Sequence, residues 1–170
     1  MDDLKISAFL VDHAPVFPAF GYQINYKGCK VVISGDTKIT DSLATHVENA
    51  NILINEAFSD FLSKKGIKEA KQENNKTKLA QIYETKQYHS DTLALAKMAA
   101  KANVKYLFLT HLVPTISNND KAKKTFIIGM KRYYKGILIV ADDKDQLVLS
   151  SNSSQHCKVS YLPIQSFRIK

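Results

Sequence analysis

The chain has 170 residues, of which 45% are hydrophobic and 24% are charged, and its net charge is +8. This length and composition are typical of one soluble globular domain with a hydrophobic core. No apolar run reaches the roughly 18 to 20 residues that cross a bilayer, and acids stand at the N-terminus where a signal peptide would be basic. We therefore expect no membrane partner, no export signal and a cytoplasmic location.

Cysteines and lysines bear on the kinds of partner the chain could have. Cys29 and Cys157 are too few and too far apart in sequence to predict a disulfide scaffold or a zinc knuckle. Lysines concentrate in residues 63–78 and 121–135, and a basic surface favours anionic partners such as phosphate esters or nucleic acid. An ordinary solvated face is the simpler interpretation on composition alone, because neither stretch shows a known nucleic-acid-binding motif.

The first elements predicted along the chain are strands. Residues 4–13 read as a strand because they are rich in apolar and β-branched side chains. Two prolines in the segment 14–20 predict an ordered loop rather than a helix. Residues 21–37 predict a hairpin that turns at Lys27–Gly28, and its second strand ends at Asp36.

The middle of the chain mixes short elements with a polar excursion. A short amphipathic helix over 41–50 has Thr40 or Asp41 as its expected N-cap. A buried strand over 51–58 follows. The segment 59–88 is polar and lysine-rich, which predicts either an exposed helix or a mobile excursion.

The clearest helical pattern covers residues 90–104, where Ser90 can cap the first turn. Three small or apolar side chains are expected to share its buried face: Leu93, Ala96 and Ala100. Residues 105–111 predict a strand that ends in a histidine, and residues 135–150 predict two strands joined by a turn. The last segment, 151–170, has no clear pattern.

Chemically capable side chains follow three of the predicted strands. Asp36, Glu56 and His111 stand at or near strand ends, and ligands of α/β sheets collect beyond the carboxyl ends of the strands. Taken alone, Asp36 would more often form a turn and His111 a structural contact. His89 precedes a helix and could position a substrate or donate a proton. Their convergence in an α/β layered fold is the strongest physical signal in the sequence.

Several segments together resemble the C-terminal half of the metallo-β-lactamase fold, especially ribonuclease Z and the arylsulfatase-like hydrolases. They are VDHAPVFPAFGYQI, VVISGDT, NILINEAF, YHSDTLALAKMAAKANVKYLFLTHLVP and GILIVADD. The resemblance implies an α/β fold that is half of an αββα sandwich, with a mixed sheet and helices on its outer face. We therefore expect residues 1–150 to form the C-terminal half of such a domain and residues 151–170 to form a C-terminal tail.

The resemblance also implies roles for individual residues. Asp36 corresponds to the carboxylate that bridges two zinc ions, and His111 corresponds to the last histidine ligand of the second zinc. Glu56 and His89 correspond to a catalytic pair whose histidine protonates the leaving oxygen or holds the phosphate. His13 corresponds to a histidine on the substrate side. The implied reaction is zinc-dependent hydrolysis of a phosphodiester or related anionic ester, with RNA among the candidate substrates.

The family's H-x-H-x-D-H metal signature is absent, because no two of the five histidines are two or five residues apart. A zinc site needs three or four ligands, and the resemblance assigns only two here. We therefore expect the chain to be inactive alone, and to need an N-terminal half, a partner chain or a second copy to cover its apolar face. The alternative is a non-catalytic remnant or binding module that retains the half-fold without metal.

The short separation between His13 and Asp36 leaves no room for the long tRNA-gripping arm of many ribonuclease Z enzymes. This departure favours an arylsulfatase-like or general phosphodiesterase member. The positive net charge of the chain favours phosphodiesters over sulfate esters as substrates.

Overall fold

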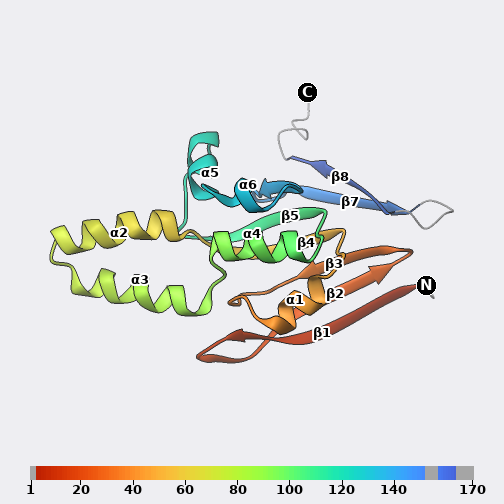
Figure 1. The fold of residues 1–170 in the computed structure, drawn as a ribbon, viewed down its shortest axis with the longest axis horizontal. Coiled ribbons are helices and arrows are strands. Elements are labelled where there is room, and N and C mark those ends of the chain that lie inside the picture. Colours follow the sequence, from red (N-terminus) through yellow and green to blue (C-terminus); the bar gives the residue numbers. More distant parts are fainter. Residues whose placement is uncertain (1–2, 152–156, 164–170) are drawn as a thin grey trace.

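The computed structural model describes residues 3–151 and 157–163. Its main feature is a six-stranded sheet in which each strand pairs with the next along the chain (Figure 1). The first three strands pair antiparallel and the last three join them in parallel, so the predicted mixed sheet is confirmed. The strands are β1 (Leu4–His13), β2 (Val16–Tyr26), β3 (Cys29–Ile33), β4 (Ile52–Phe58), β5 (Tyr106–Val113) and β6 (Ile137–Val140).

Helices pack on one face of this sheet and bury the hydrophobic core (Figure 1). They are α1 (Asp41–Val47), α4 (Thr92–Lys101), α5 (Asp120–Phe126) and α6 (Met130–Tyr133). Val32, Leu53 and Leu107 from the strands are fully buried with Leu43 of α1 and Leu95 of α4. Within the described residues, no helix is long and apolar enough to cross a membrane.

The caps of two helices show which local predictions succeeded. Thr40 caps α1 by accepting a hydrogen bond from the Leu43 amide at 3.1 Å, as expected. Ser90 does not cap α4, because Asp91 accepts the hydrogen bonds from the first-turn amides. The Ser90 hydroxyl instead donates to the Thr37 carbonyl at 2.6 Å. The predicted cap is therefore wrong by one residue, and Ser90 becomes a link between two loops.

The buried face of α4 also differs in part from the prediction. Ala96 is buried as expected, but Ala100 is exposed and Leu93 is only partly buried. Leu95 and Ala99 complete the buried face, so the helix is rotated relative to the expected pattern.

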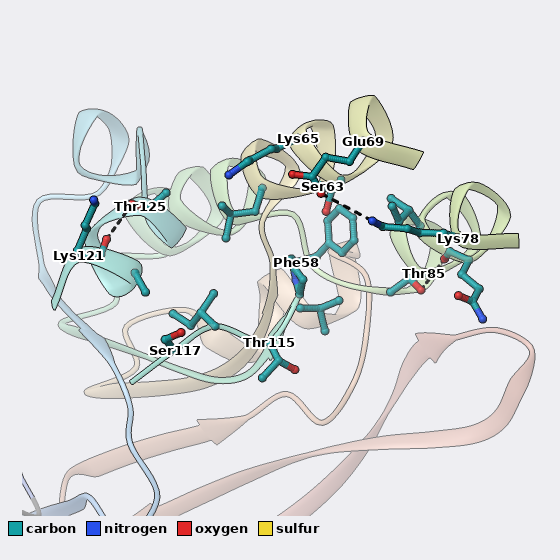
Figure 2. Close-up of a pocket in the computed structure, with 18 of the residues that line it drawn as sticks. Phe58, Ser63, Lys65, Glu69, Lys78, Thr85, Thr115, Ser117, Lys121 and Thr125 are labelled. Carbon is teal, nitrogen blue, oxygen red and sulfur yellow. Dashed lines mark hydrogen bonds and ion pairs between the residues drawn. The ribbon is translucent and has the colours of Figure 1, made fainter. Parts of the chain in front are cut away.

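The polar segment 59–88 forms two helices, α2 (Asp60–Gln72) and α3 (Lys76–Tyr88), so the helical interpretation is confirmed. They pack against each other and extend away from the sheet (Figure 1). Lys86 of α3 forms an ion pair with Asp60 at the start of α2. The side of α2 that faces the body of the protein borders a pocket (Figure 2).

The predicted loop at residues 14–20 is wrong, because β2 begins at Val16 and pairs back onto β1. The pairing shifts register between Val11 and His13, and Pro18 lies opposite this irregularity. A proline cannot donate a ladder hydrogen bond, so it is tolerated where the ladder is interrupted.

A two-stranded sheet, β7 (Gln146–Ser151) and β8 (Cys157–Leu162), contacts the six-stranded sheet. Cys29 and Cys157 form a disulfide that ties the start of β8 to the start of β3. The sequence did not predict this single disulfide, because only folding brings together residues that are 128 positions apart. Part of the expected tail thus forms a strand, and the remainder, 152–156 and 164–170, lies outside the described residues.

The face of β1 and β2 that points away from the helices is apolar and exposed. Ile6 is 62% exposed, Leu10 52% and Tyr22 45%, whereas Phe9 and Val11 on the helix side are buried. A sheet that is apolar on both faces is normally buried on both. The chain thus leaves the outer face of β1 and β2 unburied.

Candidate active site

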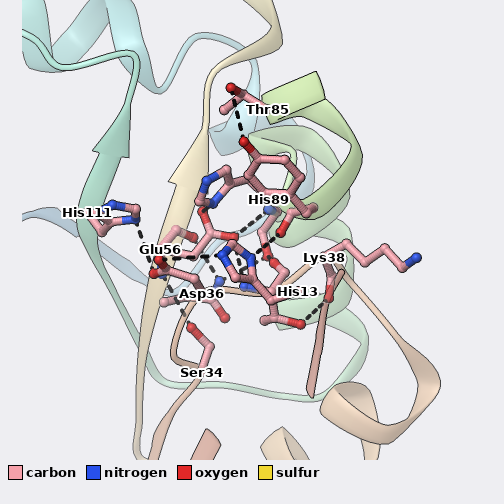
Figure 3. Close-up of polar contacts among 12 residues, drawn as sticks. His13, Ser34, Asp36, Lys38, Glu56, Thr85, His89 and His111 are labelled. Atoms are coloured by element: carbon pink, nitrogen blue, oxygen red, sulfur yellow. Dashed lines mark hydrogen bonds and ion pairs between the residues drawn. The ribbon is translucent and has the colours of Figure 1, made fainter. Parts of the chain in front are cut away.

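The five residues assigned to the site meet beyond the carboxyl ends of the central parallel strands (Figure 3). Asp36 follows β3, Glu56 lies in β4 and His111 lies in β5. His13 ends β1, and His89 joins α3 to α4. The structure therefore places all five predicted residues in one cluster.

A sharp turn after β3 presents Asp36. Gly35 has a φ of +63°, and a Cβ atom at this position would lie 2.5 Å from the Phe20 carbonyl oxygen. Only glycine fits such a close approach to backbone in the left-handed region. The turn directs the Asp36 carboxylate to His111, whose Nδ1 lies 3.1 Å from Oδ1.

His111 is presented by an irregularity within β5 rather than by the end of the strand. Thr110 pairs with Glu56 and Leu112 with Ala57, so His111 is an extra residue between two paired positions. Its φ is +41°, and its side chain is 53% exposed. The predicted strand end is therefore wrong by two residues, and the bulge re-aims the histidine towards the site.

Glu56 and His89 form a buried pair beside the exposed side chains of Asp36 and His111. Their side chains are 1% and 6% exposed, and Glu56 Oε2 lies 3.1 Å from His89 Nδ1. The approach is not aligned for a hydrogen bond, so neither atom has a hydrogen-bond partner among the described residues. Glu56 Oε1 accepts hydrogen bonds from the amides of Ser90 and Thr37, which fixes the carboxyl group.

Burial controls the protonation of this pair. Desolvation raises the pKa of Glu56 to about 8, against the opposing effect of hydrogen bonds from Ser90 and Thr37. Desolvation lowers the pKa of His89, against the attraction of the negative charge on Asp36. At neutral pH the pair therefore favours a neutral carboxyl group beside a neutral imidazole.

Replacing Glu56 with glutamine is expected to stabilise the metal-free protein increasingly as the pH rises from 5 to 8. The pKa of Glu56 is raised on folding, so wild-type stability is fully present below the unfolded value and falls as pH rises towards about 8. The change in the stability difference is at most about 1.4 kcal/mol per pH unit. Urea unfolding at several pH values in the presence of a chelator measures it.

The matched control is Glu84→Gln, because Glu84 is exposed on α3. A constant difference between Glu56→Gln and wild type across this pH range would contradict the raised pKa.

Tyr88 is a site residue that the sequence reasoning missed. Its carbonyl oxygen lies 3.1 Å from His13 Nδ1, and its ring contacts the rings of His13 and His89 at centroid distances of 5.0 Å. His13 Nε2 in turn lies 4.0 Å from Asp36 Oδ2. The position directly before His89 was the available signal. Tyr88 thus packs against both histidines, whose rings also contact each other at 5.3 Å, and its carbonyl orients His13.

The donor atoms of the cluster fit a divalent metal ion. Ligand atoms of Glu56, His89 and His111 all lie within 4.8 Å of one another, and Asp36 adds a carboxylate beside His111. Imidazole nitrogens together with carboxylate oxygens are a donor set that suits zinc. Glu56 Oε2 and His89 Nδ1 have no hydrogen-bond partner among the described residues, and buried polar atoms normally have one, so these two atoms are available for a further contact.

Sequence comparison identifies relatives of this chain. The chain is 30% identical over 115 residues to a ribonuclease Z from Mycolicibacterium gilvum, covering 68% of this chain and 36% of that protein. It is 29% identical over 152 residues to a ribonuclease Z from Mycobacterium avium, covering 89% of this chain and 50% of the relative. No protein-family model matches the chain.

Comparison with solved structures identifies the same fold as the sequence resemblance, the metallo-β-lactamase fold. The metallo-β-lactamase fold protein YhfI from Bacillus subtilis superposes with a TM-score of 0.56 at 23% identity, over 82% of this chain and 47% of that one. The chain is a ribonuclease Z-like protein with the metallo-β-lactamase fold. This ribonuclease Z-like chain matches between about a third and a half of the length of these relatives. Its mixed sheet with helices on one face agrees with the fold that the resemblance implied.

Proposed function

We propose that this ribonuclease Z-like chain contributes part of the active site of a zinc-dependent hydrolase of phosphodiesters or related anionic esters. The observation that carries the proposal is the convergence of four side chains from separate elements: Asp36 after β3, Glu56 in β4, His89 between α3 and α4, and His111 in the bulge of β5. Exposed donors stand beside a buried carboxyl–imidazole pair. Metal-assisted hydrolysis needs both kinds of group in one place.

Asp36 and His111 are the proposed zinc ligands. Their side chains are 41% and 53% exposed, so their donor atoms are accessible. Glu56 and His89 are buried, and Glu56 Oε1 already accepts two backbone hydrogen bonds. Zinc, when bound, activates a water molecule and stabilises negative charge on a phosphoryl group. Two ligands are fewer than zinc requires, so we propose that a segment or partner beyond this chain supplies the rest.

Glu56 and His89 are the proposed proton-transfer pair. Glu56 is fixed by the Ser90 and Thr37 amides and faces His89 Nδ1, which leaves Nε2 for the substrate. Because burial lowers the pKa of His89, its protonated form gives up a proton readily to a leaving oxygen. His13, oriented by the Tyr88 carbonyl, completes the substrate side.

An anionic substrate is supported by the net charge of +8, which attracts phosphate groups. RNA is the proposed polymer, since the curated relatives are ribonucleases by name, and sulfate esters are the second candidate. The exposed apolar face of β1 and β2 is proposed to be buried by a second sheet, from an N-terminal half, a partner chain or a second copy.

Zinc binding to the 170-residue chain tests this function directly. Competition with a chromophoric chelator is expected to show weak binding that falls by about tenfold or more in Asp36→Ala and in His111→Ala. Asp41→Ala is the control, because Asp41 is exposed on α1. We also expect no measurable turnover of bis(p-nitrophenyl) phosphate by the chain alone.

Two outcomes would contradict the proposal. Unchanged zinc affinity in both variants would show that Asp36 and His111 are not ligands. No zinc binding by the wild-type chain would favour the alternative, a non-catalytic remnant or binding module.

A further inference from the structure

A pocket of about 760 Å³ lies between the α2–α3 pair, α5 and the loop that follows β5 (Figure 2). This volume falls within the range of about 300–1,000 Å³ that is typical of small-molecule sites. Apolar side chains form a large part of its wall: Phe58, Leu62, Ile82, Val113 and Ile116. The cavity is therefore suited to a flat or apolar group of moderate size.

Polar side chains also line the pocket, and two lysines stand at its edge. Hydroxyl and amide groups come from Ser63, Gln81, Thr85, Thr115, Ser117 and Asn119. Lys65 of α2 and Lys121 of α5 are exposed, and neither has an ion-pair partner within the part of the chain that the structure describes. Figure 2 shows these lysines on different helices beside the cavity. The pocket thus combines an apolar wall, hydrogen-bonding groups and unpaired positive charge.

The pocket adjoins the active site. Phe58 and Val113 pair across β4 and β5, and each lies two residues, or about 7 Å, beyond Glu56 or His111. Thr85 lines the pocket, and its Oγ1 accepts a hydrogen bond from the Tyr88 hydroxyl at 3.5 Å. Since Tyr88 also contacts His13 and His89, one side chain connects the pocket to the catalytic cluster.

We propose that this pocket binds one nucleoside monophosphate unit of the substrate, with its base against the apolar wall and its phosphate at Lys65 and Lys121. The inference rests on the proposed function, because it supplies a subsite beside the bond to be cleaved. The base offers a flat apolar face for the partly exposed Leu62 and Ile82, and its edge offers donors and acceptors for the hydroxyl and amide groups.

Other anions fit the lining less well. An acyl chain would bury against the apolar wall but would displace water from the Gln81, Thr115 and Ser117 side chains without replacing its hydrogen bonds, which is costly. A phosphate or sugar phosphate would satisfy the lysines but would leave the apolar wall empty. The nucleotide is the ligand class that uses both parts of the pocket.

Titration of the 170-residue chain with adenosine 5′-monophosphate, followed by heteronuclear NMR, tests the proposal. We expect shifts at Gly66 and Ile82, and an affinity at least about tenfold tighter than that for ribose 5-phosphate, which lacks the base. Without added metal and without turnover, the result does not depend on whether the chain belongs to an active hydrolase. Loss of zinc binding in the preceding experiment would therefore leave this test intact.

Two variants separate the parts of the pocket. Lys65→Ala combined with Lys121→Ala is expected to weaken nucleotide binding by about tenfold, whereas Lys101→Ala, on exposed α4 surface, should not change it. Gly66→Leu is expected to abolish binding, because Gly66 lines the pocket and the leucine side chain would fill it. The added Cβ alone would lie 3.3 Å from Ile82 Cδ1. Leucine also favours the helical conformation more than glycine, so α2 should stay folded.

Three results would overturn the proposal. They are equal affinity for the nucleotide and for ribose 5-phosphate, unchanged nucleotide binding in Gly66→Leu, and binding of decanoate in this pocket in preference to the nucleotide.

Discussion

Gly35→Ala is expected to destabilise the protein by about 3 kcal/mol. The φ of +63° strains any residue with a side chain, and the new Cβ would lie 2.5 Å from the Phe20 carbonyl oxygen. That oxygen belongs to the backbone of β2 and cannot move away without disturbing the sheet. The distortion would also displace Asp36, so we expect zinc binding to fall as well. Urea unfolding monitored by circular dichroism measures the loss.

Gly66→Ala is the matched control for this substitution. Gly66 lies in α2, and its added Cβ would meet only the flexible end of Ile82 at 3.3 Å. Alanine favours the helix over glycine, so a gain of about 0.5–1 kcal/mol is expected. A loss below 1 kcal/mol for Gly35→Ala would show that the turn relaxes and does not depend on glycine.

Phe58→Ala is expected to cost about 3–5 kcal/mol, as is usual when a fully buried aromatic side chain is removed. Phe58 is 1% exposed and lies between the candidate site and the pocket beside α2. Its amide donates to the Ser90 carbonyl at 2.7 Å, so its strand is held against the loop that carries His89. Thermal and urea unfolding should both report the loss.

Phe61→Ala is the comparison for this variant, because Phe61 follows on α2 but is 50% exposed. We expect a change below about 1 kcal/mol there. Comparable losses for the two substitutions would mean that Phe58 is not a central packing residue.

The residues of the candidate site could be predicted as a set, because their order along the chain resembles a known family although each local signal is weak. An apolar run ending in Gly35–Asp36 marks a strand followed by a turn, and His89 stands before a clear helix. Parallel strands then place their carboxyl ends together, which brings Asp36, Glu56 and His111 to one edge. Topology therefore favours the convergence of these three side chains, and the family resemblance identified the five residues of the cluster.

Other features depend on contacts that no local pattern contains. The cap of α4 is Asp91, because Ser90 is occupied by the Thr37 carbonyl from a distant loop. The bulge at His111 exists because β4 and β5 shift register beside Glu56. Both predictions were wrong because the neighbouring segment, and not the local sequence, decided the geometry.

The sequence by itself predicted most of the strands and helices, the basic charge and, through the family resemblance, the five site residues, because hydrophobic periodicity and motif chemistry are local properties. Only the tertiary structure decided the burial of Glu56, the role of Tyr88, the Cys29–Cys157 disulfide and the pocket beside α2. Each of these depends on segments that are far apart in the chain and are brought into contact only when the sheet and its helices pack. Asp36 combines both kinds of feature, since its turn is local but its partner His111 is 75 residues away.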